Sequence, residues 1–197
     1  MKIVIINYGA GNIQSIKFAI QRLGYEAILS NDPEEIITAD KVIFPGVGEA
    51  SSAMKKLKES GLDTLVPKLK QPVLGICLGM QLMCNYTEEG NTTGLGIFDV
   101  EVVRFNHGVK VPQIGWNQIE SLKSQLFNGV NEKEYIYLVH SYYATVTRET
   151  VAQSSYGVTY STALHKDNFY GTQFHPEKSS DVGEKILSNF LNLPTNN

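Results

Sequence analysis

The sequence is poor in cysteine, and this shortage excludes two classes of protein. It has only Cys77 and Cys84, too few for a disulfide-stabilised scaffold. A helix between them would hold them about 10 Å apart along its axis, so no bridge between them is expected. With the four histidines they form no C-x-x-C or H-x-x-x-H pattern. A zinc site is therefore not expected, and neither is any other metal or cofactor.

Long hydrophobic runs and clustered charge are also missing. The first apolar run, "IVII", is followed at once by an asparagine and is too short for a signal peptide, and no run reaches membrane length. The 17 basic and 20 acidic residues are mixed along the chain and give a net charge of −3. The sequence therefore predicts a cytoplasmic protein with no membrane contact and no nucleic-acid partner.

What is present predicts one α/β domain over residues 1–197, because no linker, repeat or low-complexity stretch divides the chain. Strand-like and helix-like patterns alternate over the first ninety residues, which predicts a doubly wound, mostly parallel sheet with flanking helices. The segments are 2–7, 13–24, 26–30, 32–39, 41–46, 50–60 and 72–77, followed by another helical stretch.

The second half of the sequence changes character. Three segments, 95–105, 135–147 and 151–174, are rich in β-branched and aromatic residues separated by turn residues. They predict additional antiparallel or mixed strands. A last helix over 180–192 is expected to begin at a Ser/Asp cap and to bury Val182, Ile186 and Phe190, which are four residues apart.

The segment "GICLG" places Cys77 between Gly75 and Gly79, where a predicted strand gives way to a helix. This is the G-x-nucleophile-x-G form of a sharp strand-to-helix turn. At a helix N-terminus the sulfur faces free backbone N–H groups and the positive end of the helix dipole, which favour a thiolate. The alternative is a small buried hydrophobic residue on a parallel strand.

A cysteine nucleophile needs a base and a group that orients the base, and "HPE" supplies both. His175 ends an aromatic strand, and Pro176 disfavours helix there, so Glu177 is expected to project to the same face of an extended segment. The alternative is an ordinary turn with a solvated carboxylate. Among the other histidines, His140 also follows a strand, whereas His107 and His165 are expected in loops.

Two glycine-rich segments follow predicted parallel strands. In "PGVGEA", residues 45–50, Gly46 and Gly48 can present backbone N–H groups to an oxyanion, together with the N–H of Leu78. Parallel strands end at one edge of a sheet, where ligands bind in such folds. The segment "YGAGN", residues 8–12, lacks the third glycine of a dinucleotide-binding motif, so nucleotide binding is not expected.

In this order, "PGVG", "GICLGMQ" and "HPE" resemble the class I, or triad, glutamine amidotransferases, whose domain is flavodoxin-like. The resemblance implies that Cys77 attacks the side-chain amide of glutamine, that His175 moves the proton and that Glu177 orients His175. The acyl-enzyme thioester is then hydrolysed to glutamate. It also implies an oxyanion loop of Gly46, Val47 and Gly48 with Leu78, and glutamine contacts from Gln81, Glu89, Ser141 and Tyr142.

The resemblance is closer to one branch of that family, through "NYGAGNIQSI", "KVPQIGWNQI", "VHSYYA" and "GTQFHPEKS". Members of this branch pair as heterodimers with a separate (β/α)8-barrel cyclase, which uses the ammonia to make imidazole glycerol phosphate and AICAR in histidine synthesis. The resemblance implies that Asn12, Trp116 and Lys178 face that barrel, although a buried core position for Trp116 is an equal alternative. It also implies that the free glutaminase is nearly silent until a peptide flip in the "PGVG" loop completes the oxyanion hole.

Several alternatives stay open from the sequence. A paralogous glutaminase could feed a related barrel partner in sugar amination. A non-catalytic relative would lack a triad residue, and a hydrolase of similar topology would make the glutamine contacts coincidental. Many members of the resembled family carry histidine where Gln113 stands, but glutamine preserves the capacity to form hydrogen bonds.

Overall fold

The structure is a computed structural model that describes residues 1–9, 11–106 and 108–195. Its α-helices are α1 (Ile13–Arg22), α2 (Pro33–Ile37), α3 (Ala50–Glu59), α4 (Leu62–Leu65), α5 (Leu78–Met83) and α6 (Ser180–Leu191). Short 3-10 turns are η1 (Val66–Lys68), η2 (Glu89–Asn91), η3 (Gln125–Phe127) and η4 (Pro176–Lys178). The strands are β1 (Ile3–Ile6), β2 (Ala27–Ser30), β3 (Lys41–Gly46), β4 (Val73–Cys77), β5 (Cys84–Thr87), β6 (Thr92–Thr93), β7 (Phe98–Arg104), β8 (Gln113–Gln118), β9 (Tyr135–His140), β10 (Tyr142–Ala144), β11 (Thr150–Ser155), β12 (Thr159–Lys166) and β13 (Phe169–Thr172).

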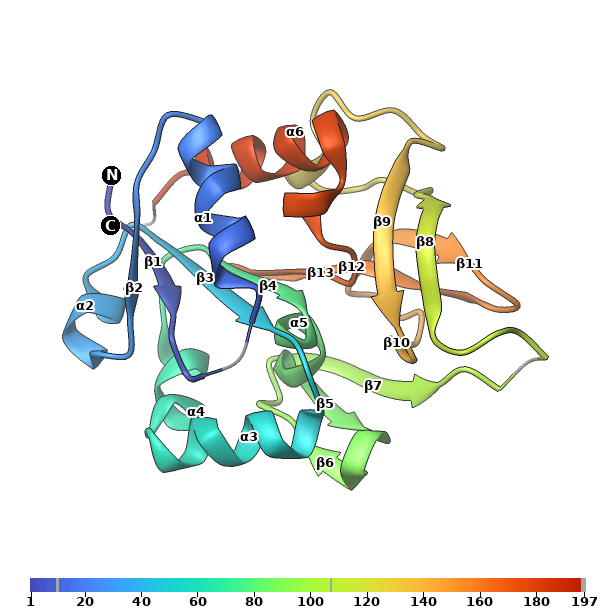
Figure 1. Ribbon diagram of the computed structural model, residues 1–197, viewed down its shortest axis with the longest axis horizontal. Coiled ribbons are helices and arrows are strands. Elements are labelled where there is room, and N and C mark those ends of the chain that lie inside the picture. The colour runs from blue at the N-terminus through green and yellow to red at the C-terminus, as the bar shows by residue number, and fades with distance from the viewer. Residues whose placement is uncertain (10, 107, 196–197) are drawn as a thin grey trace.

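One large mixed sheet runs through the molecule, with helices on both of its faces (Figure 1). Its strand order is β2-β1-β3-β4-β13-β12-β10-β7-β5-β6, and β11 pairs with β12 beside this path. The strands from β2 to β13 in that order are parallel, whereas β12 and β10 pair with antiparallel neighbours. The predicted α/β fold, with a doubly wound parallel part and additional antiparallel strands, is therefore confirmed.

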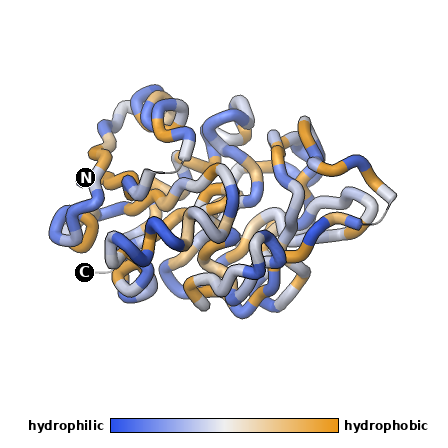
Figure 2. Tube along the Cα trace, turned by 60° about the horizontal axis from the view of Figure 1, so that its bottom comes forward, coloured by the Kyte–Doolittle hydropathy of each residue, from blue (hydrophilic) through white to orange (hydrophobic). Residues whose placement is uncertain are grey.

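The first strand shows why the parallel half is so apolar in sequence. Val4 and Ile6 pack into one core cluster with residues of α2 and α3, while Ile3 and Ile5 pack into a second cluster with residues of α1 and α6. A strand covered on both faces has no solvent side, so its hydrophobic run is continuous rather than alternating. Figure 2 accordingly shows hydrophobic segments running through the middle of the molecule.

The antiparallel pair β8 and β9 forms a second, two-stranded sheet at one end of the molecule (Figure 1). The sequence indicated β9 but not β8, whose segment carries Gly115 and polar residues among few β-branched ones. It likewise missed β5, which starts directly after the six-residue helix α5. Short elements of this kind are too brief for hydrophobic periodicity to reveal.

Helix ends agree with the sequence patterns in one case and differ in another. Asp32 caps α2 by accepting a hydrogen bond from the Glu34 N–H at 3.0 Å. The expected Ser/Asp cap at the start of 180–192 is wrong: the N-cap residue of α6 is Ser179, and its side chain makes no cap bond. Its hydroxyl oxygen accepts from the Tyr137 N–H at 3.0 Å instead, and the hydroxyl donates to the carbonyl of His175 at 2.7 Å.

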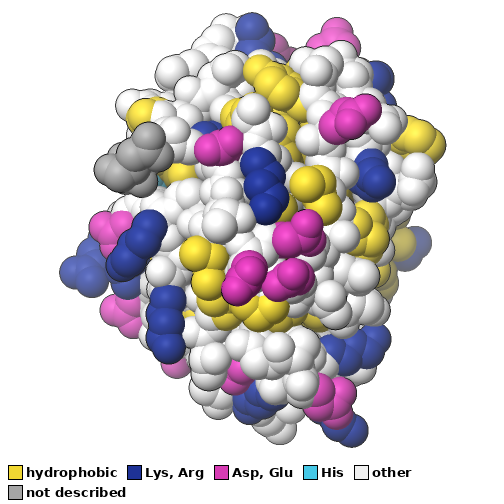
Figure 3. Space-filling view, turned by 90° about the vertical axis from the view of Figure 1, so that its left-hand side faces the viewer, with side chains coloured by type: hydrophobic (Ala, Val, Ile, Leu, Met, Phe, Trp, Pro, Cys, Tyr) yellow, Lys and Arg dark blue, Asp and Glu magenta, His cyan; other side chains and the backbone are white. Residues whose placement is uncertain are grey.

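The end of the molecule formed by β2 and α2 carries both signs of charge. Figure 3 shows acidic and basic side chains interspersed on this face. Single hydrophobic side chains are also exposed there, namely Ile28, Leu29 and Ile37. Among the described residues, no helix is long and apolar enough to cross a membrane.

Candidate active site

The parallel pairing of β4 with β13 brings Cys77 and His175 to one edge of the sheet. Ile76 of β4 pairs with Thr172 of β13. Cys77 directly follows Ile76, and His175 lies three residues beyond Thr172. On the other side of β4, Gly46 of β3 pairs with Cys77 itself. The nucleophile candidate, the base candidate and the glycine-rich loop therefore meet where parallel strands end, which is the ligand-binding edge of such sheets.

Cys77 occupies a strained turn between β4 and α5. Its backbone has φ of 54° and ψ of −112°, a combination that side-chain-bearing residues rarely adopt. The turn is possible because its neighbours lack side chains. A Cβ on Gly79 would overlap the carbonyl oxygen of Phe44, and a Cβ on Gly75 would overlap Met83.

Replacing Gly79 with alanine tests this packing. The added methyl meets backbone, which cannot move aside as a side chain can, so we expect a loss of roughly 1–3 kcal/mol in the free energy of unfolding. Urea denaturation measures it. The control is Gly24→Ala, at φ of 85° with no atom in contact, which is expected to cost only about 1 kcal/mol. Equal losses in the two variants would contradict the packing argument.

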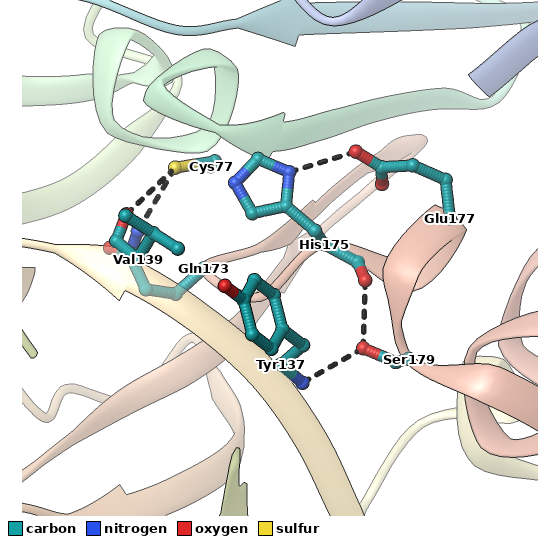
Figure 4. A network of polar contacts seen from close by, with 7 residues as sticks. All are labelled: Cys77, Tyr137, Val139, Gln173, His175, Glu177 and Ser179. Atoms are coloured by element: carbon teal, nitrogen blue, oxygen red, sulfur yellow. Dashed lines mark hydrogen bonds and ion pairs between the residues drawn. The ribbon is translucent and has the colours of Figure 1, made fainter. Parts of the chain in front are cut away.

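His175 is held between Cys77 and Glu177. Its Nδ1 lies 2.8 Å from Glu177 Oε1, and its other ring nitrogen points toward the Cys77 sulfur (Figure 4). Burial lowers the pKa of His175, but the interactions with Cys77 and Glu177 outweigh it and raise the pKa to about 10. The ring therefore carries a proton at neutral pH and can deliver it to a leaving group.

The backbone of His175 is fixed by Ser179 and β9, which the sequence did not reveal. The Ser179 hydroxyl donates to the His175 carbonyl and accepts from the Tyr137 N–H at 3.0 Å. The His175 N–H donates in turn to the Tyr137 carbonyl at 3.0 Å. These hydrogen bonds hold the "HPEKS" turn against β9 of the two-stranded sheet and fix the orientation of the imidazole.

A cavity of about 370 Å³ opens beside the sulfur. Most of the residues expected to form an oxyanion loop or to contact glutamine line it, and so do both reactive side chains. They are Val47, Gly48, Cys77, Leu78, Gln81, Glu89, Ser141, Tyr142 and His175. Gly46 and Glu177 are not in its lining: Gly46 lies in the β3 register opposite Cys77, and Glu177 lies behind His175. The volume suits a ligand of amino-acid size.

Two lining residues already have intramolecular partners. Gln81 donates through Nε2 to the Tyr142 carbonyl at 3.0 Å and to Gln173 Oε1 at 2.8 Å. Glu89 Oε2 accepts from the Ala50 N–H at 2.9 Å, at the start of α3. Burial raises the pKa of Glu89 despite that bond. Each side chain is thus held in place, and Gln81 Oε1 and Glu89 Oε1 are left for a ligand.

Gln173 is a further residue at the sulfur that the sequence did not reveal. Its Nε2 lies 3.7 Å from Cys77 Sγ, and the Val139 carbonyl lies 3.8 Å from the same sulfur (Figure 4). Gln173 precedes His175 by two residues. Because side chains two apart in extended chain share a face, this spacing was the signal that could have indicated Gln173.

The loop before α3 is anchored by Tyr8. Its hydroxyl donates to the Pro45 carbonyl at 2.7 Å, and a Cβ on Gly46 would lie 2.9 Å from the Tyr8 hydroxyl oxygen. Burial, with the charge of Cys77, raises the pKa of Tyr8. The phenol therefore stays neutral and donates its hydrogen bond to Pro45, the residue of β3 that precedes Gly46.

The three residues expected at a partner interface lie in different settings. Lys178 is exposed and lines the cavity, whereas Asn12 is half-buried at the start of α1 and lies outside the lining. Trp116 is 53% exposed, so the alternative of a core tryptophan is wrong. Its ring packs edge-on against Tyr137 at 5.7 Å between centroids.

The competing histidines occupy other places. His140 ends β9 and lines the cavity, but its ring nitrogens are bonded to Gln113 and to the Tyr142 carbonyl. His165 lies within β12 and stacks on Tyr170, so its expected loop position is wrong. Turn-forming residues lie close to it in the sequence and suggested a loop. Its pairing with β13 shows that the segment is a strand. His107 lies outside the described residues.

Metal ligation and disulfide formation have no visible basis in the site. Both cysteines are free and buried, and Cys84 lies 3.5 Å from the Met80 carbonyl. Over residues 1–9, 11–106 and 108–195, no three His, Cys, Asp or Glu side chains are grouped as metal ligands. The chemistry open to the described side chains is nucleophilic attack by sulfur with proton transfer by imidazole.

Known proteins are similar to this chain in sequence. The family model for "Glutamine amidotransferase class-I" matches residues 4–193. The chain belongs to this family. Among curated members, it is 57% identical over 196 residues to imidazole glycerol phosphate synthase subunit HisH of Bacteroides fragilis, covering 98% of this chain and 100% of the relative. The protein of the same name from Pectobacterium atrosepticum is 45% identical, with the same coverage of both chains.

Solved structures share the fold at low identity. A putative GMP synthase protein from Thermoplasma acidophilum matches with a TM-score of 0.76 at 21% identity, over 97% of this chain and 92% of that one. The structure of PurLQS from Thermotoga maritima gives 0.74 at 16% identity, over 97% of each chain. At such identities the likeness concerns the fold alone.

Proposed function

We propose that the chain is the glutaminase subunit of an imidazole glycerol phosphate synthase, acting in histidine biosynthesis. It hydrolyses L-glutamine to glutamate and ammonia and delivers the ammonia to a (β/α)8-barrel cyclase subunit, with which it forms a heterodimer. The full-length identity of 57% to a HisH protein is the observation that carries this assignment. The cavity beside Cys77 and His175 supports it.

The proposed reaction uses the three aligned side chains in turn. Cys77 sulfur attacks the glutamine side-chain carbonyl, and the N–H groups of the loop at Gly48 and of Leu78 stabilise the oxyanion. His175 gives its proton to the departing ammonia, which leaves a thioester. His175 then takes a proton from the attacking water, glutamate departs, and the sulfur is released as a thiolate beside the protonated imidazole. Glu177 keeps the ring in the orientation for both transfers.

The outer face of β8 and β9 supports the proposed docking of the cyclase. In the antiparallel register Trp116 lies opposite Tyr137 and Ile114 lies opposite Val139. Ile114, Trp116 and Tyr135 are more than half exposed, and Val139 also lines the cavity. An exposed aromatic and aliphatic face that borders the site suits a partner that receives the product before water protonates it.

Replacing Trp116 with alanine tests this interface. We expect the dissociation constant for the cyclase to rise by about tenfold or more, because large exposed aromatics are the common anchors of protein interfaces. Isothermal titration calorimetry measures it. The control is Ile37→Ala, a side chain that is 55% exposed on α2 at the opposite end of the molecule, and it should leave binding unchanged (Figure 1). Equal binding by both variants would place the interface elsewhere.

Glutamate release tests the function itself. The purified chain is assayed alone, with the cyclase, and with the cyclase and its ligand together. The proposal predicts low release alone and strong release in the liganded complex, coupled to formation of imidazole glycerol phosphate. Glutamate release without that product, or complementation of a sugar-amination defect instead of a histidine auxotroph, would favour the paralogous glutaminase.

A further inference from the structure

Next to the cavity, buried polar side chains form a chain of hydrogen bonds. The Tyr160 hydroxyl lies 3.0 Å from Gln113 Oε1, and the same oxygen lies 2.9 Å from His140 Nε2. The other nitrogen of His140 lies 2.8 Å from the Tyr142 carbonyl. Gln113, His140 and Tyr160 are all more than nine-tenths buried.

The chain continues from the Tyr142 carbonyl to the sulfur. That carbonyl also accepts from Gln81 Nε2 at 3.0 Å, and Gln81 Nε2 donates to Gln173 Oε1 at 2.8 Å. Gln173 Nε2 completes the path at 3.7 Å from Cys77 Sγ. The path therefore joins β8, whose neighbouring residues Ile114 and Trp116 are exposed, to the nucleophile candidate.

We propose that Gln113 and His140 are positioning residues for glutamine hydrolysis, which hold the Tyr142 carbonyl and, through Gln81 and Gln173, the sulfur of Cys77. This inference rests on the proposed function of the site. A buried amide without a hydrogen-bond partner costs free energy. Each amide in the path is therefore oriented to bond with its neighbour, and the orientation of one constrains the orientation of the next. Loss of Gln113 therefore affects a sulfur that Gln113 does not contact.

The path also defines the proton on His140. Burial is the main reason that its pKa is lowered, to about 4, so the ring is neutral at pH 7 and has one N–H. The Tyr142 carbonyl can only accept, which puts that proton on Nδ1 and makes Nε2 an acceptor. Because Nε2 then accepts, the Gln113 amide must be turned by half a rotation from the placement with Oε1 toward these partners, so that its NH2 group donates to both Nε2 and the Tyr160 oxygen.

A double-mutant cycle in the complex with the cyclase tests the path. Gln113→Leu and Gln173→Leu are each expected to lower kcat/KM for glutamine by about 10-fold, the effect of one lost hydrogen bond at a reacting centre. The double variant should lose clearly less than the product of the two, because either change breaks the same path. Effects that multiply, or a Gln113→Leu variant within about twofold of wild type, would overturn the inference.

Rescue and spectroscopy separate positioning from stability. Gln113→His keeps two hydrogen-bonding atoms and is expected to restore kcat/KM to within about threefold, with ammonia-driven cyclase activity unchanged in every variant. Nitrogen-15 spectra of the isolated chain should show His140 protonated at Nδ1, and protonation at Nε2 would overturn the path. The spectra do not depend on catalysis. A wild-type complex that releases no glutamate would instead refute the proposed function.

Discussion

Replacing Cys77 with alanine is expected to abolish glutamine hydrolysis in the complex, with a loss of at least about 10⁴-fold in kcat. The sulfur is the one nucleophile at the point where β4 meets α5, and no thioester forms without it. Coupled measurement of glutamate release gives the loss. Ammonia supplied directly should still support the cyclase reaction, because the cyclase partner itself is unchanged.

The second cysteine provides the matched control. Cys84 is fully buried and lies outside the cavity lining, and burial raises the pKa of its thiol. Cys84→Ala is therefore expected to retain glutaminase activity within about threefold, with some loss of stability from the removed sulfur. Residual hydrolysis by Cys77→Ala, or inactivation by Cys84→Ala in a folded protein, would contradict the assignment of the nucleophile.

Replacing Glu177 with glutamine is expected to lower kcat by roughly 10²- to 10⁴-fold with little change in KM. The carboxylate accepts the Nδ1 proton of His175 at 2.8 Å, whereas an amide can donate to that nitrogen and favour the wrong tautomer. Steady-state kinetics measure both constants. Glu59→Gln, on the exposed surface of α3, is the control and should be silent. A fall in kcat below twofold for Glu177→Gln would contradict the orienting role.

The same variant changes how stability depends on pH. The pKa of His175 is about 10 in the folded chain, against 6.5 for an ordinary histidine, so its proton stabilises the fold. That stabilisation is complete below pH 6.5 and is lost as the pH rises through 10. The stability difference between wild type and Glu177→Gln should therefore shrink over this window. Urea denaturation at several pH values measures this difference. A difference that grows with pH would contradict the stabilising role of the His175 proton.

Much of the fold follows from the sequence because burial on both faces makes parallel strands easy to recognise. The runs at β1, β3 and β4 are continuous and apolar, and each is followed by a turn and a helix. What the sequence does not show is the neighbour of each strand. The parallel pairing of β13 with β4, which brings His175 beside Cys77, depends on contacts between segments about a hundred residues apart.

The candidate site divides in the same way. Cys77 is visible because a strained turn requires its flanking glycines. The pair of His175 and Glu177 is visible in "HPE", but the extended segment expected there is wrong, because Glu177 reaches the imidazole from the 3-10 turn η4. The supporting groups are not visible. Ser179 lies just before the predicted helix, Gln173 lies in a predicted strand segment, and only the folded structure brings each to its partner.

The direct test of the central claim is covalent capture of the nucleophile. The complex with the cyclase and its ligand is incubated with a glutamine analogue that carries an electrophilic ketone in place of the amide, and the digested chain is analysed by mass spectrometry. We expect one adduct, on the peptide containing Cys77, and its absence in His175→Ala or in the presence of excess glutamine. An adduct on another residue, or labelling that glutamine does not prevent, would contradict it.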